Sequence, residues 1–211
     1  MKGDIFHILN RGIEKGAIFH ETDDYKRFLL GLYKFNNQGS ALNLSNKDWF
    51  INYPTQSKIV EILAWSLLPN HYHLLLQEKI DGGAIDFTKR IGNGYTKYFN
   101  IKNNRSGYLF QNSAKIIRVE KNEHFLYLPF YIDANPIDLI EPGWENKGIK
   151  NKEKVISFLK KYQWSSYQDH TGVLNFPQIL NKKLFYELFD TNPKNYQKDF
   201  LGWLFDFNLP R

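Results

Sequence analysis

The sequence predicts an α+β fold: a ferredoxin-like split βαβ unit, in which an antiparallel sheet carries helices on one face, and a mainly helical C-terminal extension. The first observation is the order of the apolar patterns, which run strand, helix, strand, strand, helix, strand. The second is that only Pro69-Asn70, a turn signal, separates the two central strand patterns, which makes these strands antiparallel neighbours.

The N-terminal part of the unit contains one strand and one helix. Residues 4–10 form a short apolar run that ends at the turn signal Arg11-Gly12. Residues 22–36 begin with a threonine suited to N-capping and continue with large apolar side chains at helical spacing. They are therefore predicted to form an amphipathic helix, and the polar stretch 36–48 is predicted to be a loop.

The remaining elements of the unit follow from the same patterns. Residues 58–68 and 71–77 are apolar runs of strand length. Residues 84–101 have helical periodicity, although two glycines within them each cost about 1 kcal/mol relative to alanine. Residues 108–119 are predicted to supply the last strand.

A third helix and an extension complete the predicted chain. The helix covers residues 122–134 and ends at Asn135-Pro136, because a residue before proline is driven out of the α region. Residues 141–154 are rich in Gly, Asn, Lys and Glu and are the best linker candidate. We therefore predict a catalytic core over 1–140 and an extension over 141–211, which contains short amphipathic helices and packs on the core.

Composition favours a polyanionic partner. The formal net charge is +6, and aromatic residues make up 17% of the chain, a high share that suits base stacking as well as core packing. Residues 87–121 contain eight basic residues and one acid, although a solvated face would give the same run. The residues that we predict to contact DNA are Arg11, Lys89, Arg90, Lys97, Lys102, Arg105, Lys115 and Arg118.

Other classes of site and location are disfavoured. The chain has no cysteine, which excludes disulfides and thiolate metal sites. The N-terminal residues lack the apolar stretch of a signal peptide, and no window approaches 18 uninterrupted apolar residues. We expect a cytoplasmic protein with no membrane partner.

The candidate metal ligands are His71 and His73. They lie two residues apart on a predicted strand, so both imidazoles project from the same face of the sheet and are able to hold one metal ion. A lone histidine is more often structural than a ligand, and the pair requires a third ligand to make a convincing site.

The third predicted helix offers a third ligand together with a nucleophile. Tyr131 and Asn135 are four residues apart and share one helix face. A phenol, an amide oxygen and two imidazoles are what metal-assisted phosphoryl transfer through a covalent tyrosine would use. The alternative is that Tyr131 packs in the core and Asn135 only ends the helix.

These residues resemble those of the IS200-type single-tyrosine transposases, which carry a His-hydrophobic-His motif, and particularly the REP-associated tyrosine transposases. The two most specific motifs are Asn70-His71-Tyr72-His73-Leu74 and Tyr131 with Asn135-Pro136. Weaker matches span most of the chain in the family's order. They are His7-Ile8-Leu9-Asn10-Arg11-Gly12, Ile18-Phe19, Asp24-Tyr25, Phe28-Leu29, Tyr95, Tyr98-Phe99-Asn100, Gly107-Tyr108-Leu109-Phe110-Gln111 and Trp164-Ser165-Ser166-Tyr167.

The resemblance implies a metal-dependent enzyme that cuts and joins single-stranded DNA next to a foldback hairpin through a 5′-phosphotyrosine intermediate. Tyr131 would be the nucleophile, and His71, His73 and Asn135 the ligands of Mg²⁺ or Mn²⁺. The REP-associated branch is implied to act as a monomer, whereas related insertion-sequence enzymes act as dimers. Pro129 departs from the pattern, because it removes a helical hydrogen bond two residues before Tyr131 and is expected to kink or restart the helix.

Three alternatives stay open on the sequence. Tyr95 and Tyr98 are rival nucleophiles, but neither has an amide or carboxylate four residues later. The chain could instead be a domesticated, non-catalytic protein that binds hairpin nucleic acid. It could also be an unrelated metal enzyme, such as an oxygenase whose third ligand is a carboxylate.

Overall fold

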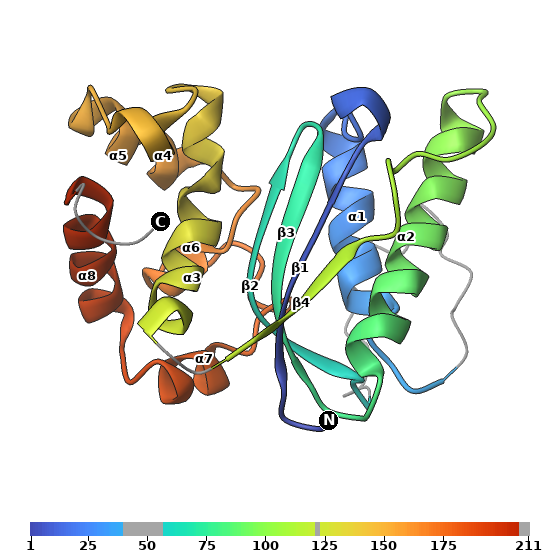
Figure 1. The fold of residues 1–211 in the computed structure, drawn as a ribbon, viewed down its shortest axis with the longest axis horizontal. Coiled ribbons are helices and arrows are strands. Elements are labelled where there is room, and N and C mark those ends of the chain that lie inside the picture. Colours follow the sequence, from blue (N-terminus) through green and yellow to red (C-terminus); the bar gives the residue numbers. More distant parts are fainter. Residues whose placement is uncertain (40–56, 121–122, 207–211) are drawn as a thin grey trace.

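A computed structural model describes residues 1–39, 57–120 and 123–206 and shows a four-stranded sheet with helices on both faces (Figure 1). The strands are β1 (Ile5–Arg11), β2 (Val60–Leu68), β3 (His71–Glu78) and β4 (Lys115–Val119). They lie in the order β2-β3-β1-β4, and every neighbouring pair is antiparallel. The predicted α+β fold with a helical C-terminal region is confirmed.

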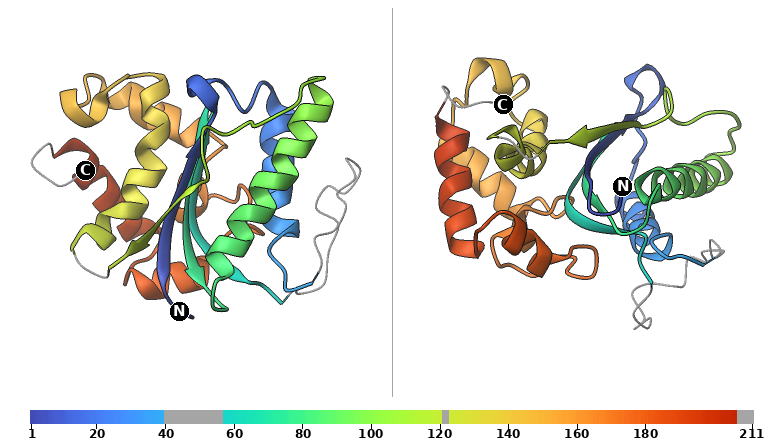
Figure 2. Two further views of the ribbon diagram at one scale, coloured as in Figure 1. Left: turned by 45° about the vertical axis from the view of Figure 1, so that its right-hand side comes forward. Right: turned by 60° about the horizontal axis from the view of Figure 1, so that its bottom comes forward.

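One face of the sheet is covered by α1 (Thr22–Lys34) and α2 (Gly83–Lys102), the two helices of the split βαβ unit (Figure 2). Their apolar sides pack on Ile8 and Leu74 from the central strands. Gly94 lies where a Cβ would come within 2.5 Å of the Phe35 ring, so this glycine lets α2 approach the end of α1. That close packing offsets the helix propensity that the glycine costs.

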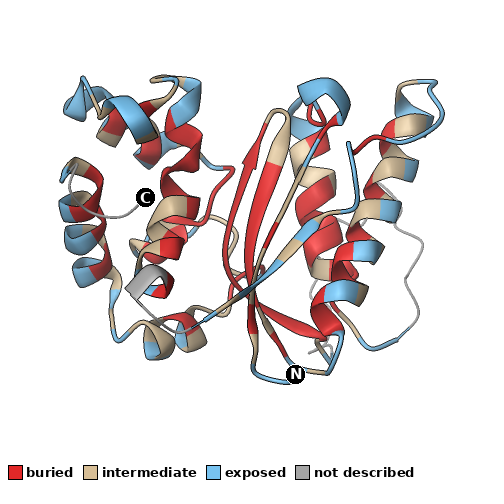
Figure 3. Cartoon of the chain, viewed as in Figure 1, coloured by how far each residue is buried: buried red, intermediate tan, exposed pale blue. Residues whose placement is uncertain are grey.

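The other face is covered by α3 (Glu123–Ala134) and by the helices of the C-terminal region. The latter are α4 (Trp144–Lys147), α5 (Lys152–Lys161), α6 (Tyr167–His170), α7 (Lys182–Leu188) and α8 (Pro193–Phe205). All nine residues of β2 are buried, as expected of a strand covered on both sides, and most of β3 is buried as well (Figure 3). None of the described helices is both long and apolar enough to cross a membrane.

Two segments differ from the sequence-based expectation. The last strand covers only Lys115–Val119, because Phe110 pairs with Gly12 in an isolated bridge and the polar residues after it bend away. The segment 141–154 is not an open linker, since it contains α4, whose Trp144 is 1% exposed. Glu141 also accepts hydrogen bonds from the backbone N–H groups of Lys150 and Asn151, which ties the segment together. The predicted loop 36–48 lies largely outside the described residues.

Pro129 does not restart α3, which continues through it to Ala134. A proline inside a helix removes one backbone hydrogen bond and costs about 3 kcal/mol. Burial of the neighbouring Leu128 and Ile132 against the sheet compensates for this cost. Tyr131 is therefore presented by the last turn of an uninterrupted helix.

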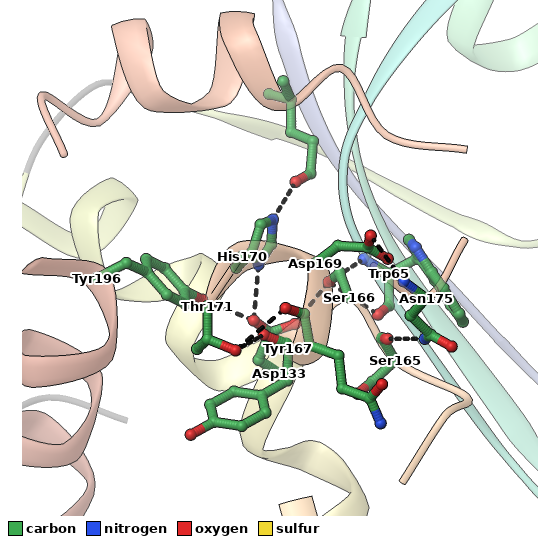
Figure 4. A network of polar contacts seen from close by, with 12 residues as sticks. Trp65, Asp133, Ser165, Ser166, Tyr167, Asp169, His170, Thr171, Asn175 and Tyr196 are labelled. Atoms are coloured by element: carbon green, nitrogen blue, oxygen red, sulfur yellow. Dashed lines mark hydrogen bonds and ion pairs between the residues drawn. The ribbon is translucent and has the colours of Figure 1, made fainter. Parts of the chain in front are cut away.

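A buried polar network joins α3 to β2 and the C-terminal helices (Figure 4). Asp133, which is fully buried, accepts hydrogen bonds from Ser166 Oγ, from His170 Nδ1 at 2.7 Å and from the Tyr196 hydroxyl at 2.7 Å. The other His170 nitrogen lies 2.9 Å from the carbonyl oxygen of Leu63 in β2. Both ring nitrogens face acceptors, so this geometry suits an imidazolium paired with the Asp133 carboxylate.

Replacing Asp133 should strongly destabilise the protein. Asp133→Ala leaves an imidazole and two hydroxyl groups buried without their acceptor, and breaking a buried ion pair from one side costs about 3–5 kcal/mol. Urea denaturation followed by circular dichroism measures this loss. The matched control is Asp199→Ala at an exposed site on α8, which should change stability by less than about 0.5 kcal/mol. Equal stability of the two variants would show that the network does not hold α3 in place.

Candidate active site

The two histidines of β3 lie on the face of the sheet that α3 covers. His71 is opposite Arg11 and His73 is opposite Leu9 in the pairing of β1 with β3. Leu75, which follows on the same face, packs in the core that contains Ile132 of α3. The period of the strand therefore directs both imidazoles towards α3, as the sequence predicted.

Asn135 meets His71 at the end of α3. Asn135 Oδ1 lies 3.0 Å from His71 Nε2, and His71 Nδ1 lies 2.6 Å from Asn70 Oδ1. The rings of His71 and His73 are 5.3 Å apart. The structure therefore brings together the three residues that were predicted as ligands.

The hydrogen-bonding pattern of His71 suits a bound cation. A neutral imidazole carries one N–H, so His71 is able to donate to only one of the two amide oxygens that it faces. If Nδ1 donates to Asn70, then His71 Nε2 and Asn135 Oδ1 present lone pairs to each other at 3.0 Å. Ligands of a Mg²⁺ ion at about 2.1 Å in octahedral geometry are about 3 Å apart, so this pair suits two ligands of one metal.

Tyr131 lies beside these ligands. Its ring makes an edge contact with His73, with ring centres 5.7 Å apart, and with His7, with ring centres 6.3 Å apart. The Asn135 side chain, one helical turn from Tyr131, acts to lower the pKa of the phenol. The candidate nucleophile thus lies beside the same side chain that offers the third ligand.

These groups open into a cleft of about 550 Å³. His71, His73, Tyr131 and Asn135 form one part of its wall. The remaining wall comes from β1, the start of β4 with the polar segment before it, and the segment after α3. These residues are Leu9, Asn10, Arg11, Gln111, Asn112, Ser113, Lys115, Asp138, Gly143, Glu145 and Asn146. The cleft is therefore polar, and both the predicted core and the predicted extension line it.

Burial favours the uncharged forms of the two histidines and of Tyr131. Burial, together with repulsion from His7, His71 and Arg11, holds the pKa of His73 well below its usual value. Burial also lowers the pKa of His71. Burial and the nearby Glu145 carboxylate raise the pKa of Tyr131. Neutral imidazoles are the form that binds metal, whereas the phenol needs a nearby positive charge to become a good nucleophile.

The predicted DNA-contacting residues separate into three groups. Arg11 and Lys115 line the cleft. Lys89, Lys97 and Arg105 are exposed on α2 or just after it. The other three are engaged within the protein: Arg90 with Asp86, Arg118 with Asp4, and Lys102 with Asp24 and Glu21.

The rival tyrosines lie on the opposite side of the sheet from the histidines. The hydroxyl of Tyr95, which is buried, donates to the carbonyl oxygen of Ile18 at 2.6 Å, and that of Tyr98 donates to Asp24 at 2.9 Å. Both rings belong to or pack against the core under α1 and α2. Their position gives them structural roles.

A carboxylate-based metal site is not present among the described residues, in which no three His, Cys, Asp or Glu side chains are placed to hold an ion. A metal at this cleft would need the amide oxygen of Asn135. From the sequence no role was assigned to His7, which contacts His73 from β1, or to Asn70, which contacts His71, although both lie in the matching motifs. The motif from His7 to Gly12 was the feature of the sequence that pointed to His7.

The fold is similar to that of a known class of enzymes, the tyrosine transposases. The chain matches a solved structure of a REP-associated tyrosine transposase bound to a REP hairpin, with a TM-score of 0.50 over 84% of this chain and 85% of that chain. The identity is 17%, so this likeness concerns the fold. No protein-family model and no curated protein matches the sequence. The resemblance inferred from the motifs is thus confirmed at the level of the fold.

The depressed pKa of His73 predicts a pH dependence of stability. In the folded, metal-free protein His73 binds fewer protons than in the unfolded chain. The free energy of unfolding should therefore fall as the pH drops through the unfolded value of about 6.5. His73→Gln should flatten this dependence, as measured by urea denaturation between pH 8 and pH 5 with a chelator present. His20→Gln, at an exposed site, is the control and should keep the wild-type slope. An unchanged slope in His73→Gln would contradict the assignment.

Proposed function

We propose that this protein is a transposase that cuts and rejoins single-stranded DNA beside a hairpin through a covalent 5′-phosphotyrosine. The observation that carries the proposal is the convergence of Tyr131, Asn135, His71 and His73 in one polar cleft, with Asn135 Oδ1 3.0 Å from His71 Nε2. The fold shared with a transposase bound to a REP hairpin supports it.

The reaction exchanges one phosphoester bond for another. The Tyr131 oxygen attacks the scissile phosphorus and loses its proton, while the bond to the 3′ oxygen breaks and leaves a free 3′-OH. The resulting phosphotyrosine preserves the energy of the bond, so a 3′-OH of another strand is able to reverse the step. Asn135 and Arg11 both act to lower the pKa of the phenol, and Arg11 lines the cleft, where it would place a positive charge beside the phosphate.

We propose Mg²⁺ or Mn²⁺ as the cofactor, held by His71, His73 and Asn135. When bound, the ion would polarise the non-bridging phosphate oxygens and neutralise developing charge. The amide oxygen of Asn135 belongs to the ligand class that suits these ions, and there is no cysteine to favour a softer metal.

We expect one copy of the chain to suffice, because both histidines, Tyr131 and Asn135 come together within it. Light scattering that gave twice the 25.0 kDa of one chain would contradict a monomer. The alternative to catalysis is a non-catalytic protein that binds the same hairpin DNA. Such a protein would bind the DNA and form no covalent adduct.

Tyr131→Phe should abolish cleavage and leave folding, metal binding and hairpin binding close to wild type. It removes one oxygen and keeps the ring in its contacts with His7 and His73. Denaturing electrophoresis of labelled single-stranded substrate measures the slow band of protein joined to a 5′-phosphate. Tyr98→Phe is the control and should keep that band. A band that persists in Tyr131→Phe and disappears in Tyr98→Phe would assign the nucleophile elsewhere.

His71→Ala combined with His73→Ala should remove both metal binding and cleavage, because Asn135 alone is a weak ligand. Titration calorimetry with Mn²⁺ on the metal-free protein gives the affinity. His20→Ala is the matched control and should bind Mn²⁺ as the wild type does, since His20 is exposed and does not line the cleft. Unchanged Mn²⁺ affinity in the double variant would place the metal elsewhere.

The protein should prefer hairpin or single-stranded DNA to a blunt duplex of the same length. For Z neutralised phosphates on a single strand, log K should fall against log salt with a slope of about −0.7Z. Lys115→Ala should reduce that slope by about one phosphate contact. Lys183→Ala, at a side chain that is 88% exposed on α7, should leave the slope unchanged. Equal affinity for the blunt duplex at equal salt would count against a single-strand substrate.

A further inference from the structure

His7 of β1 lies against the candidate metal ligands without lining the cleft itself. Its Nε2 is 2.9 Å from His73 Nδ1, and the two rings are stacked with centres 5.2 Å apart. The pairing of β1 with β3 explains this contact, because His7 is opposite Leu75 and thus one step along the same face from His73. His7 therefore contacts the His73 ring without itself lining the cleft.

The contact holds one proton between two ring nitrogens, and metal binding through Nε2 of His73 decides which nitrogen carries it. A neutral imidazole carries its proton on one nitrogen only. For His73 to offer Nε2 to a metal, its Nδ1 must carry the proton and donate it, and the lone pair on His7 Nε2 is the acceptor 2.9 Å away. If His7 were replaced by an apolar side chain, nothing in this contact would favour that form over the one with the proton on Nε2.

The neighbouring ligand shows the same arrangement with a different partner. His71 Nδ1 lies 2.6 Å from Asn70 Oδ1, an oxygen that is able only to accept. With the proton on Nδ1, His71 donates to Asn70 and its Nε2 presents a lone pair on the side of Asn135, whereas the opposite tautomer donates from Nε2 to Asn135 Oδ1. Both histidines thus have at Nδ1 an atom that is able to accept, which is the arrangement that lets Nε2 serve as a metal ligand.

We infer that His7 is a positioning residue of the candidate metal site, which fixes the ring orientation and the tautomer of His73 so that Nε2 faces the cleft. The inference rests on the proposed function, because it assumes that His73 binds a metal. Removing a side chain that accepts a hydrogen bond from a metal-binding histidine typically weakens metal affinity 10–100-fold.

Two variants separate positioning from packing. His7→Phe keeps a planar ring for the stack and removes both nitrogens. His7→Gln gives up the ring but places an amide oxygen near the position of Nε2. If His7 only packs, Phe should be the milder change, and if its nitrogen matters, Gln should be the milder change. His20→Phe, at an exposed histidine away from the cleft, is the matched control.

The first measurement is titration calorimetry of each metal-free protein with Mn²⁺. We expect His7→Phe to bind 10–100-fold more weakly than wild type, His7→Gln to recover most of the loss, and His20→Phe to match wild type. Thermal unfolding without metal checks that each variant folds. Wild-type affinity in a folded His7→Phe would overturn the inference, as would a Gln variant weaker than Phe.

The second measurement is the tautomer of His73, read from nitrogen chemical shifts of ¹⁵N-histidine-labelled protein without metal. We expect the Nδ1-protonated form in wild type and in His7→Gln, and a shift towards the Nε2-protonated form in His7→Phe. An Nε2-protonated His73 in wild type would overturn the inference. If wild type binds no Mn²⁺ but the tautomer responds to His7→Phe as expected, the positioning role stands and the proposed metal-dependent function fails.

Discussion

The buried carboxylate of Asp133 is the constraint on which the geometry of the site depends. It lies in α3 between Tyr131 and Asn135, and its partners come from the C-terminal region, two of which, Ser166 and His170, also bond to β2. A charge with no solvent contact is tolerated only when it is fully paired, so α3 has one low-energy position against the sheet. Because residues two apart on a helix point in nearly opposite directions, anchoring Asp133 inward presents Tyr131 and Asn135 to the cleft.

The two faces of the sheet differ in the polarity of their side chains. Under α1 and α2 the side chains are apolar, and Asp24 joins the two helices by bonding to Tyr98 and Lys102. Under α3 the end of the sheet near the β2-β3 turn is polar, where His71, His73 and His7 replace aliphatic side chains. One face is therefore an apolar core, while the other combines an apolar core with the buried imidazoles of the site.

The C-terminal region is part of the site as well as its support. Gly143, Glu145 and Asn146 line the cleft, and the Glu145 charge disfavours the Tyr131 phenolate. Burial and this charge together raise the pKa of Tyr131, against the smaller opposing effect of Arg11. The division into 1–140 and 141–211 stays a prediction, but the network around Asp133 joins the two parts through buried hydrogen bonds.

The sequence by itself determined what depends on local spacing. Strand periodicity placed His71 and His73 on one face, helical periodicity placed Tyr131 and Asn135 on one face, and Pro69-Asn70 joined the two central strands. Only the tertiary structure decided which faces meet and what lies behind them. It placed His7 against His73, buried Trp144 in a segment that composition marked as a linker, and paired Asp133 with His170. These contacts join residues far apart in the chain, and local periodicity carries no information on the partners that packing brings together.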